Sequence, residues 1–144
     1  MTLEESLKAI DAAESALEAR DWNSFDAAHA ESVVVHSPST PEPTKGRQAH
    51  REQLQSLTTA FPDMKTERLS AFGSGDWISA EILVTGTNTG PLKGPTGEDV
   101  PATNKSVRLH LLNIAQVVNG EIVEEHTYFD QLGFLGQLGL LPEE

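Results

Sequence analysis

Residues 107–129 read VRLHLLNIAQVVNGEIVEEHTYF, two segments rich in apolar and β-branched residues on either side of Asn119-Gly120. Asn-Gly is a strong signal for a two-residue hairpin turn, because both residues readily adopt positive φ. We therefore expect two antiparallel strands here, over 107–118 and 122–129.

The N-terminal segment is predicted to be an amphipathic helix. Apolar residues recur at three- and four-residue spacing, which places them on one face: Leu3, Leu7, Ile10, Ala13 and Leu17. Thr2 and Glu5 have the spacing of a capping box. The helix is expected to break at Arg20-Asp21.

Further helices and a strand follow before the sheet. A short second helix directs Trp22, Phe25 and His29 toward its buried side, and the β-branched run at 33–35 is typical of a strand. A third helix is expected over 46–61, with His50 at a core position.

From Met64 onward the pattern is mostly sheet. A turn at 73–76 precedes a strand over 77–90, and a long polar loop over 91–104 is expected to cross an opening. Asp130 can cap a closing helix that buries Leu132, Leu135 and Leu138. Helices followed by an antiparallel meander predict an α+β domain over 1–144, whose sheet encloses a pocket if strongly curved.

Composition excludes several classes of function. The 144 residues carry 22 acidic and 10 basic side chains, a net charge of -12, which disfavours binding to nucleic acid or to an anionic membrane. No apolar run is long enough to span a bilayer and no secretory signal is apparent, so we expect a cytoplasmic location. The absence of cysteine excludes disulfides and thiol nucleophiles.

Alternation assigns the two faces of the strand over 107–118. Its odd positions, among them Leu111, are apolar except for Asn113, so this face is expected to point toward the helices. Asn113 is then either a satisfied core amide or a donor to a ligand. The even face is half apolar and contains His110, which suggests pairing with a second subunit through the outer face.

The return strand carries the candidate acid–base group. If Val123 faces inward, so do Glu125, Thr127 and Phe129, while Ile122, Glu124, His126 and Tyr128 face outward. Burial would then raise the pKa of Glu125 into the range of a general acid or base. The alternative is that Glu125 lies on a solvated edge. A one-residue bulge would instead turn His126 and Tyr128 inward.

Other polar and aromatic residues have both a structural and a functional interpretation. His36, at the end of its strand, is a residue of the pocket mouth or a half-exposed strand-end histidine. Asn88 is a polar mouth residue or a turn former, and Asp130 is a helix cap or a pocket-edge acid. Trp22 and Trp77 are core residues or binding platforms. The five histidines show no close pairing on one face, so no metal site is expected.

The sequence contains five motifs in this order: Ala60-Phe61-Pro62-Asp63, TGTNTGPL at 85–92, NGEIVEEH at 119–126, YFDQLG at 128–133 and QLG at 137–139. Together they resemble the SnoaL-like polyketide cyclase family of the nuclear-transport-factor-2-like superfamily. The resemblance implies a cone-shaped barrel of a strongly curved, mostly antiparallel sheet around three N-terminal helices, with a short C-terminal helix. It also implies a homodimer, an internal hydrophobic pocket, and acid–base chemistry without metal or organic cofactor.

The catalytic positions of characterised cyclases are not retained. Their acid–base aspartate corresponds to Thr127 and their partner histidine to Asn113, and neither side chain shuttles protons at neutral pH. Glu125, Asn113, His126 and Asp130 are the remaining candidates for catalysis. Thr127, Asn88, His36, Trp22, Tyr128 and Leu111 are those for binding.

Three functions are compatible with these residues. The first is an acid–base enzyme of the cyclase, isomerase or lyase kind acting on a small hydrophobic carbonyl or polyketide-like compound, with Glu125 and Asn113 in the chemistry. The second is a non-catalytic small-molecule-binding protein with the same pocket. The third is a dimerising accessory subunit whose pocket has collapsed.

Overall fold

The elements of the fold follow the sequence pattern closely. The structure is a computed structural model that describes residues 2–94 and 97–141. Its elements are α1 (Leu3–Ala19), α2 (Trp22–Ala27), β1 (His29–His36), β2 (Thr44–Lys45), α3 (Arg47–Ala60), β3 (Lys65–Ser74), β4 (Trp77–Thr87), β5 (Leu92–Lys93), β6 (Asp99–Val100), β7 (Ser106–Val118), β8 (Glu121–Phe129) and α4 (Gln131–Leu138).

The first helix begins and ends as predicted. The Glu5 backbone N–H donates to Thr2 Oγ1 at 3.2 Å, and Glu5 Oε2 accepts from the Thr2 backbone N–H, which completes the capping box. Arg20 ends the helix with φ 56° in the left-handed region. Ile10 is buried against the sheet, whereas Leu3, the first residue of the helix, is 42% exposed.

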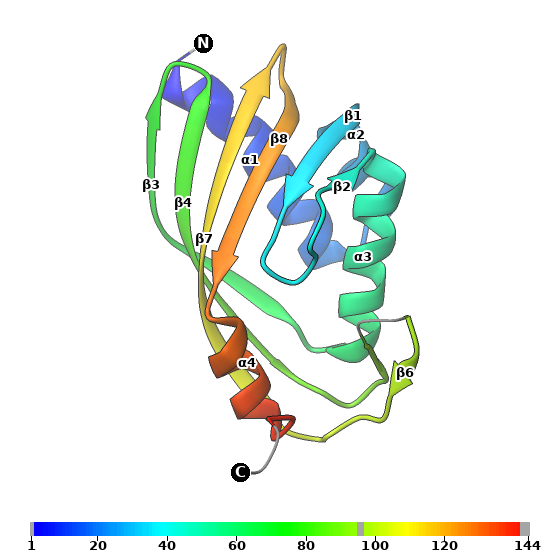
Figure 1. The fold of residues 1–144 in the computed structure, drawn as a ribbon. Coiled ribbons are helices and arrows are strands. Elements are labelled where there is room, and N and C mark those ends of the chain that lie inside the picture. The colour runs from blue at the N-terminus through cyan, green and yellow to red at the C-terminus, as the bar shows by residue number, and fades with distance from the viewer. Residues whose placement is uncertain (1, 95–96, 142–144) are drawn as a thin grey trace.

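The sheet is six-stranded and mixed, in the order β2-β1-β8-β7-β4-β3, and it curves around α1 and α3 (Figure 1). Only the β1–β8 pair is parallel among the described strands. The sheet stays open, with β2 and β3 at its edges, so the expected barrel does not close. The β7–β8 hairpin turns at Asn119 and Gly120 with φ 51° and 79°, as the Asn-Gly pair predicts.

Three register shifts interrupt the pairing of the described strands, and one of them changes a predicted face. The β3–β4 register shifts between Arg68 and Ser70, the β7–β8 register shifts between Gln116 and Val117, and the β1–β8 register shifts between His29 and Val34. A bulge changes which residues share a face. Ile122 was expected on the outer face and is instead only 1% exposed within the core, because it pairs with Val117 across the second shift.

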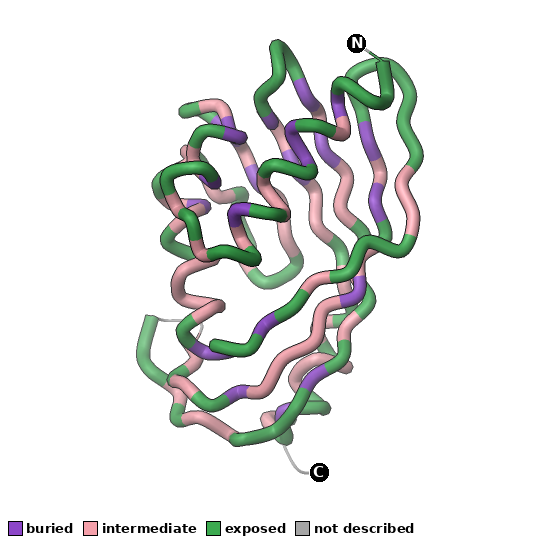
Figure 2. Tube along the Cα trace, turned by 180° about the vertical axis from the view of Figure 1, so that it is seen from behind, coloured by how far each residue is buried: buried purple, intermediate pink, exposed green. Residues whose placement is uncertain are grey.

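The core is divided into two clusters along the sheet, and Figure 2 shows buried and half-buried positions alternating along the strands. One cluster packs α1 against β1, β4, β7 and β8. The other gathers around Phe61, Met64 and Leu138, with Phe134 packed against it. Leu132 was expected in the core but is 66% exposed, because α4 presents Phe134 and Leu138, four residues apart, to the interior.

The connection between β4 and β7 is more ordered than a simple loop. Leu92–Lys93 and Asp99–Val100 pair as a small antiparallel ribbon; positions 95–96 of the expected loop lie outside the described residues. Asn88 anchors the segment. Its Nδ2 donates to the Ala60 and Gly90 carbonyls, and its Oδ1 accepts from the Thr103 N–H and hydroxyl.

None of the helices in the described ranges is both long and apolar enough to cross a membrane.

Candidate active site

The concave face of the β7–β8 hairpin carries a row of polar side chains. Asn113 pairs with Thr127 across the two strands, and Asn113 Nδ2 donates to Thr127 Oγ1 at 3.0 Å. Glu125 lies two residues before Thr127 on the same face, opposite Ala115, and is only 8% exposed. The alternation therefore predicted the orientation of Asn113, Glu125 and Thr127 correctly, and Glu125 does not lie on a solvated edge.

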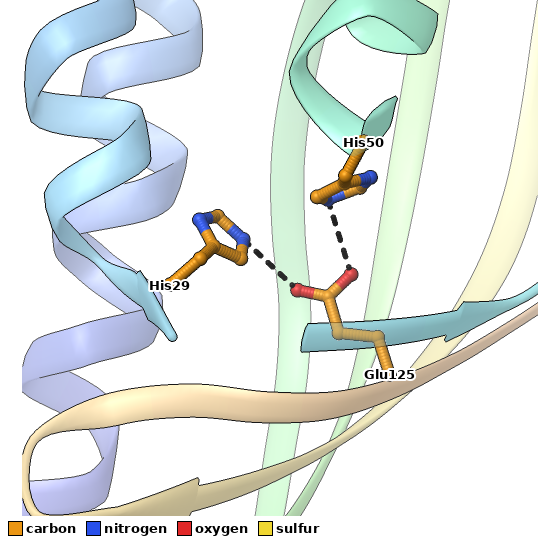
Figure 3. Close-up of side chains that lie close together, drawn as sticks. All are labelled: His29, His50 and Glu125. Atoms are coloured by element: carbon orange, nitrogen blue, oxygen red, sulfur yellow. Dashed lines mark ion pairs between the residues drawn. The ribbon is translucent and has the colours of Figure 1, made fainter. Parts of the chain in front are cut away.

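Two histidines from other elements meet the Glu125 carboxylate (Figure 3). His29, the first residue of β1, places Nε2 3.4 Å from Glu125 Oε1. His50, in the first turn of α3, places Nε2 3.6 Å from Glu125 Oε2. The two rings lie 5.0 Å apart in an edge-to-face arrangement, and both histidines are buried. Each carboxylate oxygen thus has its own imidazole.

The hydrogen bonds of His29 indicate its protonation state. Its Nδ1 lies 2.7 Å from the Phe25 carbonyl oxygen, which can only accept, so Nδ1 carries a proton. Its Nε2 faces a carboxylate oxygen and needs a proton to interact favourably with it. Burial opposes a charged ring, but the hydrogen bond and charge of Glu125, together with the Phe25 carbonyl and Asp26, raise the pKa of His29 above its usual value. This shift favours the protonated form of His29 beside Glu125.

His50 is in the opposite state. Burial lowers the pKa of His50, and the positive charge of His29 lowers it further, while Glu125 acts in the other direction. The lowered pKa favours the neutral form of His50 at pH 7. With a proton on Nε2 toward Glu125, the lone pair is on Nδ1, which is buried without a hydrogen-bond partner among the described residues.

Glu125 differs from expectation in its ionisation. Burial by itself raises the pKa of Glu125, but hydrogen bonds from His29 and Asn113, and attraction to the two histidines when they are protonated, together lower it. The predicted raised pKa is wrong, because the sequence pattern did not reveal the histidines on β1 and α3. Glu125 is an ionised group that orients its neighbours.

The face beside this cluster is accessible in part. Leu111, Asn113, Thr127 and Phe129 are half-buried on the concave side, between the two core clusters. Two surface cavities, of about 620 Å³ at the start of α3 and about 530 Å³ beside the end of α1, have no lining residue in common with this face.

Several predicted site residues lie on the outer face instead. His126 and Tyr128 point away from the core, so the alternative in which a bulge turns them inward is wrong. The His36 ring stacks on the His126 ring with a centroid distance of 4.3 Å. Trp77, expected in the core, is 37% exposed on this face, because its strand turns Ile78 inward.

The remaining candidates have structural roles. Asp130 is the N-cap of α4 and accepts from the Gly133 N–H at 2.8 Å, as predicted. Asn88 is fully buried with its amide hydrogen bonds made within the protein, so it is not a residue of a pocket mouth. Trp22 packs edge-to-face on Phe25 and is half-buried.

The expectation that no two histidines lie close together on one face is wrong. Two groups have ligand atoms close enough to share a metal ion, one composed of His29, His50 and Glu125, the other of His36, Glu124 and His126. Sequence reasoning placed His29 and His50 on buried faces but did not connect them to Glu125. The available signal was that three ionisable residues occupied predicted core positions on three different elements.

A family model and several solved structures are similar to this chain over nearly its whole length. The family model for SnoaL-like polyketide cyclases matches residues 8–138. IdmH from Streptomyces antibioticus, a proposed polyketide cyclase, is 26% identical with a TM-score of 0.76, covering 93% of this chain and 98% of its own. AclR from Streptomyces galilaeus is 22% identical with a TM-score of 0.81, covering 99% and 89%. TsrD from Streptomyces laurentii is 19% identical with a TM-score of 0.82, covering 98% and 99%. No curated protein matches the sequence significantly.

Proposed function

The chain belongs to the SnoaL-like polyketide cyclase family, and on that premise we propose that it is a cofactor-independent acid–base enzyme for a small hydrophobic carbonyl compound. The observation that carries this proposal is the buried His29–Glu125–His50 cluster beside the half-buried Asn113–Thr127 pair. The cluster supplies a neutral base and the pair supplies a hydroxyl donor. Both lie on the concave face of the sheet.

His50 is the proton acceptor in this mechanism. Its Nδ1 lone pair takes a proton from the carbon next to the substrate carbonyl, and the resulting imidazolium is stabilised by the Glu125 carboxylate at Nε2. His29 keeps Glu125 ionised and fixed, so Glu125 and His29 are positioning residues. A carboxylate whose pKa is lowered is a weak base, which is why His50 is assigned this step.

Thr127 stabilises the oxygen on which negative charge develops. Asn113 donates to Thr127 Oγ1 and also hydrogen-bonds Glu125, which occupies its amide protons. The Thr127 hydroxyl proton is then available to the substrate oxygen as the enolate forms. The enolate carbon attacks a second carbonyl to form the new C–C bond, and the alkoxide recovers the proton from His50.

The test follows exchange of carbon-bound hydrogen, because proton abstraction precedes any later step. 2-Tetralone in deuterated buffer serves as the probe, and proton NMR measures deuterium entry at its α-carbons. The wild-type chain should accelerate exchange, and His50→Ala should remove most of the acceleration. His110→Ala, at an exposed histidine on β7, is the matched control and should retain it.

Retention of the full rate in folded His50→Ala would exclude His50 as the base. Circular dichroism of each variant separates loss of the base from loss of the fold. Thr127→Val gives a second approach, since it removes a hydroxyl from a half-buried position and leaves the cluster of buried histidines unchanged.

A second candidate function is non-catalytic binding of a small hydrophobic molecule on the same face. It is favoured by the Asn113–Thr127 pair, because an amide and a hydroxyl bind a ligand oxygen without transferring a proton. Tight binding of a ligand carried through purification, with no deuterium exchange in any ketone tested, would support this function over catalysis.

The outer face is the proposed dimer interface. Tyr128 is 52% exposed, Leu112 39% and Trp77 37% on this side of the sheet. Apolar and aromatic side chains gathered on one face are typical of surfaces that pair.

A further inference from the structure

A second histidine–carboxylate cluster lies on the outer face of the sheet, separate from the proposed catalytic cluster. His36 ends β1, and it is the direct parallel partner of His126 on β8. Parallel neighbours with side chains on the same face stand close together. The two imidazole rings are accordingly stacked, with an interplanar angle of 3°.

Glu124 completes the cluster from the same face of β8. Its Oε2 lies 3.3 Å from His126 Nε2, and its Oε1 lies 3.9 Å from His36 Nε2. One ligand atom from each of the three residues lies within 4.8 Å of the others. A small adjustment of three side chains would therefore bring two imidazole nitrogens and a carboxylate oxygen around one ion.

The chemistry of the three groups determines which ion fits. Two neutral imidazoles and one carboxylate are the donor set of open Zn²⁺ sites, whereas Mg²⁺ and Ca²⁺ prefer oxygen ligands. In the single chain, side-chain exposures of 38% for His36, 35% for Glu124 and 27% for His126 leave room for water in the remaining coordination positions, and a dimer formed through this face would place the site at the subunit boundary. The chain's net charge of -12 favours a cation at its surface.

We propose that His36, Glu124 and His126 form a binding site for a divalent transition-metal ion of the Zn²⁺ class on the outer face of the sheet. The ion would join β1 to β8 and hold at least one water. This site is independent of the proposed catalytic cluster, because its residues face the opposite side of the sheet.

The buried cluster is the competing location and is less suited to an ion. His29 Nδ1 is committed to the Phe25 carbonyl, and its Nε2 carries the proton that pairs with Glu125. A metal there would have to displace that proton and enter a site in which His29 is 1% exposed. The outer cluster has none of these obstacles.

Isothermal titration of the metal-free full chain with Zn²⁺ tests the site directly. We expect one Zn²⁺ per chain and no heat of binding with Mg²⁺. His126→Ala and Glu124→Gln should each weaken Zn²⁺ binding at least about tenfold, corresponding to roughly 1.4 kcal/mol. His110→Ala and Glu125→Gln are matched controls on the outer face and in the buried cluster, and both should retain the wild-type affinity.

Trp77 provides an independent optical measurement, since its ring lies 6.3 Å from that of His126. Cu²⁺ bound at this cluster should quench Trp77 fluorescence, and Trp77→Phe should lose the quenching while retaining Zn²⁺ binding. The proposal is overturned if the wild-type chain binds no Zn²⁺, or if His126→Ala binds it as tightly as wild type. Loss of binding in Glu125→Gln but not in Glu124→Gln would place the ion in the buried cluster and equally overturn it.

Discussion

His29 and Glu125 form a buried ion pair in which the first residue of β1 meets an interior residue of β8, with Nε2 and Oε1 3.4 Å apart. Each partner alters the ionisation of the other: the pKa of His29 is raised and that of Glu125 is lowered. The contribution of this pair to the free energy of unfolding must therefore depend on pH.

The free energy of unfolding rises with pH at the acidic end of the pH range and falls with pH at the alkaline end. The lowered pKa of Glu125 stabilises the fold above its ordinary value of 4.5, and that stability is lost as pH falls through the folded-state pKa. The raised pKa of His29 stabilises the fold below its ordinary value of 6.5, and that stability is lost as pH rises through the folded-state pKa. The pair thus contributes fully between about 4.5 and 6.5.

We predict that Glu125→Gln lowers the free energy of unfolding most within this window and less at pH 9. Urea unfolding of wild type and variant at pH 6 and pH 9 measures the difference. Glu121→Gln, at an exposed position on the same strand, is the control and should show no such dependence. An equal loss at both pH values would contradict the ion pair.

The rate of proton abstraction should have an acid limb set by His50. Because the pKa of His50 is lowered, the rise on the acidic side of the pH–rate profile should lie below pH 6.5, the ordinary pKa of histidine. The rate should increase as pH rises through that region. Glu125 acts to raise the pKa of His50, so Glu125→Gln should move the limb to lower pH. Deuterium exchange measured from pH 4.5 to 8 gives both profiles, and an unmoved limb would remove Glu125 as the positioning group.

Thr127→Val should reduce the exchange rate on the order of 10²-fold, because it removes the proposed donor to the developing oxyanion. The substitution preserves shape, so ligand affinity should change much less than the rate constant at saturation. Saturation curves for wild type and variant separate the two effects. A change confined to KM would assign Thr127 to binding alone.

Asn88→Ala should destabilise the fold by about 3 kcal/mol, because it leaves buried polar partners without hydrogen bonds. The affected partners lie in three segments, at Ala60, Gly90 and Thr103. Urea unfolding measures the loss. Thr103→Val removes only one of these hydrogen bonds and should cost less, and the reverse order would contradict the anchoring role of Asn88.

Leu112→Glu should prevent dimer formation if the outer face is the interface, since it places a charge among exposed apolar side chains. Light scattering after size-exclusion chromatography gives the mass. Leu132→Glu, at a more exposed leucine on α4, is the control and should leave the mass unchanged. A wild-type chain that is monomeric at all concentrations would contradict the interface.

Local sequence signals predicted most of the elements. The capping box of Thr2 and Glu5 and the turn at Asn119-Gly120 depend on neighbouring residues alone, and both are present. The inward orientation of Asn113 and Glu125 likewise follows from alternation along a strand. Ile122 was assigned to the wrong face, because a single register shift reverses the alternation and leaves no local signature.

The ionisation of the site could not be predicted in the same way. Whether burial raises or lowers the pKa of Glu125 depends on what surrounds it in space, and the decisive groups, His29 and His50, come from a strand and a helix far away in sequence. Only tertiary packing shows that a carboxylate expected to hold a proton is instead flanked by two imidazoles. The pairing of His36 with His126 depends on the β1–β8 register in the same way.

The parallel pairing of β1 with β8 has a consequence for how the protein is made. A ribosome releases His29 long before Glu125, so the nascent chain must hold an unpaired imidazole and an incomplete sheet until β8 has been made. Contacts between such distant residues form late and slowly. The buried His29–Glu125–His50 cluster therefore forms only after β8 is available, and a chain interrupted before β8 would contain both histidines but not the carboxylate between them.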